Sequence, residues 1–226
     1  MNLEELRQKA TEAMTTEEKA ALPDHDRAIR GLAYDSTIYD AHWFGNLGWQ
    51  HPWCQKLMGW TAGEYGPFES SLDLGAGDGY YSHVLAEMGA EPAIAIEVSE
   101  EALSVMTEQV QGIVHDLREP LDLGRGFDLI ICLEMAEHLP LSAADVLCDS
   151  ITLHCSNRLI FTAAPPGQGG HGHCNLQPFS FWQDRLASRG VMFDPYETHR
   201  MKVAWKNILG DHMPWLSNNV SMFRRR

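Results

Sequence analysis

The feature that most constrains this chain is a glycine-rich turn between an apolar segment and a helical one. Residues 72–80 read LDLGAGDGY, with glycines at positions 75, 77 and 79. Glycine tolerates positive φ angles and lets a ligand approach the backbone where a Cβ would clash. In open parallel sheets, ligands lie beyond the carboxyl ends of the strands, where such a turn falls. The turn therefore predicts an α/β fold with a ligand site at its tip.

The remainder of the chain alternates between strand-like and helical patterns, which favours a parallel sheet covered on both faces. Little lies between the last two predicted strands, and this suggests an antiparallel edge. The predicted fold class is α/β, with a doubly wound, mostly parallel, seven-stranded Rossmann-like sheet. We expect strands at residues 70–74, 93–98, 112–115, 127–133, 158–163, 191–193 and 219–223, and helices at 80–88, 100–109, 142–151, 178–188 and 199–209.

The first 68 residues differ from the rest of the chain. Residues 1–22 have helical spacing, and residues 34–68 are rich in aromatics and glycine without strand alternation. We therefore expect a helical, aromatic-rich N-terminal extension over residues 1–68 and a main domain over 69–226. The aromatic zone is interpreted either as packing for the core or as a lid over a substrate.

Composition narrows the classes of partner. The formal charge is −14, from 31 acidic and 17 basic residues, and a negative field repels phosphate backbones, so nucleic acid is an unlikely partner. The basic run Arg224–Arg226 is interpreted as a solvated tail. No apolar run approaches the ~18 residues of a membrane span. The five cysteines have no metal-like spacing, and Cys132 and Cys155 look buried, so we expect a reducing, cytoplasmic location.

A carboxylate supports the glycine turn as a cofactor site. The next predicted strand, AIAIE, ends at Glu97, at about the ~20-residue spacing expected of an acceptor for ribose hydroxyls. The glycines fit the dinucleotide pattern GxGxxG only imperfectly, because Tyr80 and Tyr81 stand where its third glycine belongs. Asp73 and Asp78 would repel a pyrophosphate but attract a sulfonium and an amino group. These acids favour S-adenosylmethionine over NAD.

These segments resemble the class I, Rossmann-like S-adenosylmethionine-dependent methyltransferases, in their small-molecule subset, over most of residues 70–223. DLGAGDG at 73–79 is similar to the family's first motif, HDL at 115–117 to its adenine-contacting turn, and FDLIICLE at 127–134 to its fourth strand. Singly, Glu97 or Asp116 could be a helix cap or a solvated acid. The resemblance implies S-adenosylmethionine as cofactor and, as its binding residues, Asp73, Gly75, Ala76, Gly77, Gly79, Glu97, Val98, Asp116, Leu117 and Glu134.

The residues expected to contact the methyl acceptor follow the fourth predicted strand. Residues 134–140, EMAEHLP, resemble the E-x-x-E-H stretch of small-molecule methyltransferases. Methyl transfer needs an aligned acceptor and removal of its proton. His138 is the preferred base, since its ordinary pKa lies near neutrality. The alternative is a structural hydrogen bond between Glu137 and His138 at a helix start.

The loop at 163–177, AAPPGQGGHGHCNLQ, has three interpretations. His173 and Asn175 fix the loop or touch the acceptor, or His171 or His173 replaces His138 as base. In the third, His171, His173 and a carboxylate such as Glu134 bind a metal. The first two are preferred, so no metal is expected.

We therefore expect O-methylation of a small hydroxylated acceptor with a histidine base. The alternatives are an RNA or protein methyltransferase and a catalytically silent cofactor-binding module. The excess of acidic over basic residues counts against an RNA substrate. The Asn/Asp-Pro-Pro-Tyr/Phe signature of base and amide methylases is missing at residues 134–137. The oligomeric state is left open.

Overall fold

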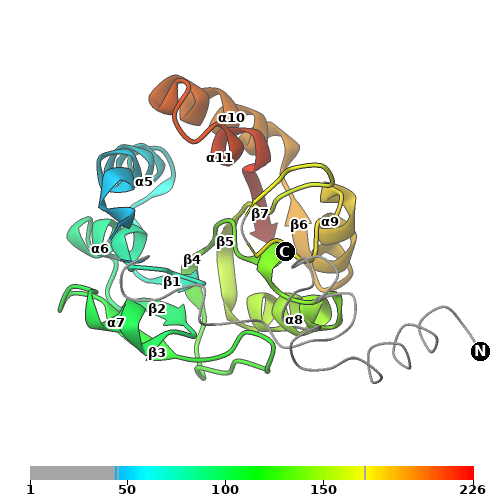
Figure 1. Ribbon diagram of the computed structural model, residues 1–226, viewed down its shortest axis with the longest axis horizontal. Coiled ribbons are helices and arrows are strands. Elements are labelled where there is room, and N and C mark those ends of the chain that lie inside the picture. Colours follow the sequence, from blue (N-terminus) through cyan, green and yellow to red (C-terminus); the bar gives the residue numbers. More distant parts are fainter. Residues whose placement is uncertain (1–43, 45, 171) are drawn as a thin grey trace, which may run out of the picture.

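A single seven-stranded sheet organises the molecule (Figure 1). The computed structural model describes residue 44, residues 46–170 and residues 172–226, so the helices expected at 1–22 lie outside the described residues. The strand order is β3-β2-β1-β4-β5-β7-β6. The strands are β1 (Ser71–Leu74), β2 (Ala93–Glu97), β3 (Gln111–Val114), β4 (Phe127–Cys132), β5 (Cys155–Phe161), β6 (Val191–Phe193) and β7 (Ser221–Arg225).

The direction of the strands agrees with the expected fold class. Neighbouring strands from β3 to β5 pair in parallel, whereas β7 runs antiparallel to both β5 and β6. The sheet is thus mixed, and the antiparallel edge predicted for the last two strands is confirmed. The chain order reverses between β1 and β4, and this switch point is where open α/β sheets bind ligands.

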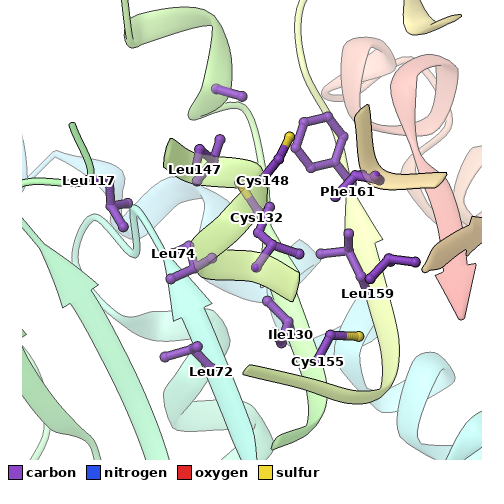
Figure 2. Close-up of a cluster of buried hydrophobic side chains, with 14 of the residues drawn as sticks. Leu72, Leu74, Leu117, Ile130, Cys132, Leu147, Cys148, Cys155, Leu159 and Phe161 are labelled. Atoms are coloured by element: carbon purple, nitrogen blue, oxygen red, sulfur yellow. The ribbon is translucent and has the colours of Figure 1, made fainter. Parts of the chain in front are cut away.

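Helices cover both faces of the sheet. α5, α6, α10 and α11 share one buried apolar cluster, and α8 and α9 pack in a second cluster on the opposite face (Figure 1). Figure 2 shows part of this second cluster, with Leu147 and Cys148 of α8. The helical elements are η2 (Leu47–Gln50), α5 (His51–Tyr65), α6 (Tyr80–Glu87), α7 (Glu100–Ser104), η3 (Ala136–His138), η4 (Leu141–Ala143), α8 (Ala144–His154), α9 (Phe179–Ser188), α10 (Pro195–Leu209) and α11 (Pro214–Asn219).

The central strand β4 shows why an unbroken apolar run is a strand here. Leu129 and Ile131 belong to the cluster under α5 and α6, while Ile130 and Cys132 belong to the cluster under α8. Successive side chains of a strand point to opposite faces. Both faces of β4 are buried, so both sets of positions must be apolar, as is typical of parallel sheets.

Several boundaries differ from the sequence-based prediction. α7 ends at Ser104 rather than at residue 109, where the exposed Val105 has no core to join. β5 begins at Cys155, directly after α8, three residues earlier than predicted. α10 begins at Pro195, because the Asp194 side chain accepts a hydrogen bond from the N–H of Glu197 and caps the helix.

The structure adds α11, for which no helix was expected, and places one helix, α5, within the segment that was expected to be a helical extension. Pro52 stands in the first turn of α5, where its missing N–H costs nothing. Leu57, Met58 and Tyr65 of α5 lie on its buried side and share a cluster with Val84 of α6. This part of the aromatic zone is therefore continuous with the core of the main domain.

The interpretation of Arg224–Arg226 as a solvated tail is wrong. Arg224 and Arg225 lie within β7 and pair with β6, and Arg224 also pairs with Arg158 of β5. The Nε–H of Arg224 donates to Asp194 over 2.7 Å. The backbone N–H of Arg226 donates to the carbonyl of Gly190 over 3.1 Å. Ladder bonds and a charge pair, rather than solvent, hold this segment.

The state of the cysteines and the length of the helices relate to two expectations from the sequence, a reducing location and the lack of a membrane span. All five cysteines are free thiols, and Cys132 and Cys155 are buried as expected. Within the described ranges, every helix is too short or too polar to traverse a lipid bilayer.

Removal of Arg224–Arg226 should lower the melting temperature by several degrees, because it takes away ladder bonds on both sides of β7 and the pair with Asp194. Differential scanning calorimetry checks this. Arg226→Ala is the matched control, because it keeps the backbone bond to Gly190 and should melt like the wild type. An unchanged melting temperature in the truncated chain would contradict docking of the segment.

Candidate functional site

A pocket of about 370 Å³ opens at the carboxyl ends of the central strands. Its walls come from η2 and α5, the turns after β1, β2, β3 and β4, the loop after β5, and α11. The volume lies within the range of small-ligand sites. Of the predicted site residues, the pocket brings together Asp73, Gly75, Ala76, Gly77, Glu97, Val98, Asp116, Leu117, Glu134, His138 and His173.

Two predicted residues stand apart from this set. Gly79 is not in the pocket wall; it adopts a left-handed conformation at the N-cap of α6. A Cβ on Gly79 would lie 2.8 Å from Cγ of Met106, so the glycine serves close packing. His171 lies outside the described residues.

The glycine turn combines positive φ angles with a close approach of the Met135 side chain to the backbone. Gly75 has φ +78° and Gly77 has φ +59°. The N–H groups of Gly75 and Ala76 both donate to the carbonyl of Ile96, over 2.9 and 3.1 Å, which ties the turn to β2. A Cβ on Gly75 would lie 2.1 Å from Cγ of Met135. The turn after β4 therefore packs where only glycine leaves room.

Glu97 ends β2 with both carboxylate oxygens oriented by backbone donors. Oε2 accepts from the N–H of Gly77 over 3.0 Å, and Oε1 accepts from the N–H of Val98 over 2.7 Å. Burial raises the pKa of Glu97, while these N–H groups lower it in part. Each oxygen has a second lone pair, so the carboxylate can still accept from two neighbouring hydroxyls.

Asp73 makes the floor of the pocket acidic. Its side chain is buried, and Ser82 donates its hydroxyl to it over 3.1 Å. Burial raises the pKa of Asp73 to about 8, opposed by the Ser82 hydrogen bond and assisted by the charges of Glu97 and Asp78. A cationic ligand in this place would relieve the cost of burying the carboxylate.

The turn after β3 carries an ion pair at the rim. Arg118 donates from its Nε–H to both oxygens of Asp116, over 2.9 and 2.8 Å, and this contact lowers the pKa of Asp116. Leu117 between them is buried and lines the pocket. Arg118 is a lining residue that the sequence analysis did not single out.

Glu134 follows β4 in a conformation that is rare outside glycine. Its φ is +51°, and strain of this kind persists where the surroundings impose it, often at functional sites. Its carboxylate accepts from the amides of Gln168 and Asn219, each over 3.2 Å. These partners come from the loop after β5 and from the end of α11, so Glu134 ties three segments together at the pocket wall.

The histidines form a compact group with a buried acid. The rings of His138 and His173 are 4.9 Å apart and nearly perpendicular, and Nε2 of His173 lies 4.0 Å from Oε1 of Glu137. Burial lowers the pKa of His173, whereas burial and the charge of Glu134 raise that of Glu137. The hydrogen bond considered between the side chains of Glu137 and His138 is not formed. Instead, Nδ1 of His138 lies 3.2 Å from the carbonyl of Gly172.

Sequence reasoning missed residues that come from distant segments. His51, interpreted as a surface or core residue, lines the pocket; its Nε2 lies 2.6 Å from Asp78, and its ring stacks on Tyr80. Trp215 and Leu216 of α11 form part of the wall. Only tertiary packing brings His51, Trp215 and Leu216 to the pocket wall, and no local motif marks them. Asn175, which the sequence analysis did name, is buried and donates its N–H to the carbonyl of Glu137, in line with the expected role of fixing the loop.

The family comparison agrees with this geometry. Residues 49–155, which run from η2 to the start of β5, match the family model described as "Methyltransferase domain". The comparison with curated proteins gives no match. This segment is thus similar to a methyltransferase domain, and the seven-stranded α/β fold agrees with that similarity.

Solved structures show the same fold at low identity. The chain is similar to a TehB-like SAM-dependent methyltransferase from Corynebacterium glutamicum (TM-score 0.54, 15% identity, covering 77% of this chain and 88% of that one). It is also similar to magnesium protoporphyrin IX methyltransferase from Synechocystis with bound SAH (TM-score 0.56, 16% identity, 97% and 93%). A [4+2]-cyclase, SpnF, is similar as well (TM-score 0.54, 13% identity, 76% and 80%), so the fold by itself does not define one reaction.

The raised pKa of Asp73 predicts a pH-dependent stability without ligand. The folded chain keeps the Asp73 proton up to about pH 8, whereas an unfolded chain loses it near 3.8. The folded state therefore binds more protons between these values, and stability falls as pH rises, by at most about 1.4 kcal/mol per pH unit from this group. Asp73→Asn, which does not titrate, should melt progressively higher than the wild type from pH 5 to 8.

Thermal melts of the ligand-free protein across this range check the slope. Asp211→Asn, at an exposed carboxylate, is the control and should follow the wild-type curve. Parallel curves for Asp73→Asn and the wild type would contradict the burial argument.

Proposed function

We propose that the chain transfers the methyl group of S-adenosylmethionine to an oxygen of a small hydroxylated acceptor bound in the pocket. The main support for this proposal is the pocket itself. It has the acidic glycine turn and Glu97 on one side and Glu134, His138 and His173 on the other. The methyltransferase-domain match supports the reaction class. The similar Synechocystis enzyme was solved with SAH bound.

We assign the half of the pocket that binds the cofactor, here called the cofactor half, from its charges and hydrogen bonds. Glu97 accepts the two ribose hydroxyls, held by the N–H groups of Gly77 and Val98. Asp73, below the glycine turn, favours the positive amino and sulfonium groups. Leu117 and Asp116 line the adenine end. S-adenosylmethionine supplies an activated methyl group, so the chain needs to align the acceptor and remove its proton.

We assign the acceptor half to the turn after β4 and the loop after β5. Its wall is formed by Glu134, His138 and His173. A carbonyl oxygen can only accept, so the contact with Gly172 means that Nδ1 of His138 carries the hydrogen and Nε2 is the basic nitrogen. His138 is the proposed base. The net charge of −14 favours a small acceptor over RNA.

Glu97→Ala should weaken binding of S-adenosylmethionine by roughly ten- to a hundredfold, about 1.5–3 kcal/mol, because both ribose hydroxyls lose their acceptor. Isothermal titration calorimetry measures this, with NAD as the competing ligand. Glu91→Ala, at an exposed acid before β2, should bind like the wild type. Unchanged affinity in Glu97→Ala, or tighter binding of NAD, would refute the assignment.

The acceptor class can be tested with methyl-labelled S-adenosylmethionine and a cell extract separated into small molecules, RNA and protein. The label should enter the small-molecule fraction. On that fraction, His138→Ala should reduce turnover by ~10²–10⁴-fold while cofactor affinity stays within twofold. His199→Ala, at an exposed position of α10, is the control.

Other outcomes identify the rival functions. Label in the RNA or protein fraction would indicate a macromolecular methyltransferase. Cofactor binding without label in any fraction would indicate a binding module. Normal turnover in both His138→Ala and His173→Ala would mean that catalysis depends on alignment alone.

A further inference from the structure

Three side chains at the acceptor wall are close enough together to share a metal ion. Glu137, His138 and His173 each offer one ligand atom, and these atoms lie within 4.8 Å of one another. Two of the three come from η3 after β4, and the third comes from the loop after β5. Since β4 and β5 are paired neighbours, the sheet itself brings the two segments to the same edge.

Backbone contacts hold these two segments in register. The N–H groups of Cys174 and Asn175 donate to the carbonyl of Glu137, over 2.8 and 2.9 Å. His138 donates from Nδ1 to the carbonyl of Gly172. That contact orients the imidazole and makes Nε2 the coordinating nitrogen, a common arrangement for histidine ligands. The group is thus built into the fold and does not arise from chance surface contacts.

Glu137 is the independent observation that points to a ligand. Its side chain is 0% exposed, and neither carboxylate oxygen has a hydrogen-bond partner of normal geometry among the described residues. The N–H groups of Glu137 and Ala164 favour its charged form only in part. Buried polar atoms are normally satisfied, so this carboxylate calls for an explanation.

Protonation of Glu137 alone does not satisfy the hydrogen-bonding capacity of its carboxyl group. A neutral Glu137 carboxyl could share its proton with the carboxylate of Glu134, but its other oxygen would still have no hydrogen-bond partner among the described residues. A divalent cation would satisfy the Glu137 carboxylate and would take one nitrogen from each imidazole. Gly170 supports the same geometry, because a Cβ there would lie 2.1 Å from Cε1 of His173. The missing side chain keeps room for that ring.

We propose that Glu137, His138 and His173 bind a divalent first-row transition-metal ion. Two imidazoles and one carboxylate suit such ions, including Zn²⁺ and Mn²⁺. His138 and His173 line the pocket, whereas Glu137 lies behind them, so the open coordination positions face the acceptor. The expectation of no metal, and the alternative set of His171, His173 and Glu134, are both replaced by this group.

The role of the ion rests on the proposed function, although its binding does not. The ion makes a hydroxyl that reaches it more acidic. The acceptor O–H bond breaks, with the proton passing to water at the pocket mouth. The oxygen bonds the methyl carbon while the carbon–sulfur bond breaks and leaves its electron pair on sulfur. In the metal-bound protein, His138 is therefore a ligand, and the ion takes over from it the activation of the oxygen.

Binding is tested on the full chain without S-adenosylmethionine. After treatment with EDTA and dialysis, Zn²⁺ is added by calorimetric titration and Mn²⁺ is followed by electron paramagnetic resonance. We expect one ion per chain, with Zn²⁺ held more tightly than Mn²⁺. Glu137→Gln and His173→Ala should each weaken both ions by at least tenfold, and circular dichroism should confirm that they fold. Gly170→Ala should weaken binding too, since it displaces the His173 ring without removing a ligand.

His83→Ala is the matched control, because His83 forms a histidine–carboxylate pair with Glu87 on α6, 3.6 Å apart and away from the pocket wall. It should bind both ions like the wild type. Absence of saturable binding in the wild type, or equal binding in Glu137→Gln and His173→Ala, would overturn the site. One ion per chain in a protein that methylates nothing would support the site and refute the proposed function. Turnover lost with EDTA and restored by Mn²⁺ or Zn²⁺ would support the role of the ion, and turnover indifferent to EDTA would overturn it.

Discussion

The site depends on the contact between two turns at the switch point of the sheet. β1 and β4 lie side by side and in parallel, so the turns after them leave the same edge. They can meet only because Gly75 has no Cβ, since that atom would lie 2.1 Å from the side chain of Met135. This contact sets the glycine turn against the segment that starts at Glu134. One missing side chain thus determines how closely the two halves of the pocket approach.

Electrostatics gives the two halves different chemical preferences. Near β1 and β2, the buried carboxylate of Asp73 accepts from a hydroxyl and the half-buried carboxylate of Glu97 accepts from backbone N–H groups. Burial raises the pKa of both groups. Such a surface favours a positively charged ligand rich in hydroxyls. Near β4 and β5, the imidazoles of His138 and His173 stand in front of the buried Glu137. That surface suits proton removal or a cation, and in the proposed O-methylation either would activate the acceptor oxygen.

Much of the fold could be predicted, because each central element has a local cause. The apolar run of β4 reflects burial on both faces, and Asp194 caps α10 through a contact within one turn. α5 lies in the segment expected to be helical, but its bounds were not predicted, because its buried residues are interrupted by glycines and aromatics and its stability comes from packing on α6 and α10. Arg224 and Arg225 read as a basic tail, although pairing with distant strands holds them in β7.

The sequence by itself predicted the residues of the proposed cofactor half of the site. These residues lie in consecutive strand ends, where spacing alone implies proximity: the glycine turn, Glu97, and Asp116 with Leu117. The sequence also named His138 and His173 for the proposed acceptor half, but only the tertiary structure decided which residues meet there. Glu137 and His138 meet His173 through the pairing of β4 with β5, and Trp215 arrives from α11. The physical reason is that strand pairing and helix packing bring together residues far apart in the chain, and burial then leaves the Glu137 carboxylate in need of a partner.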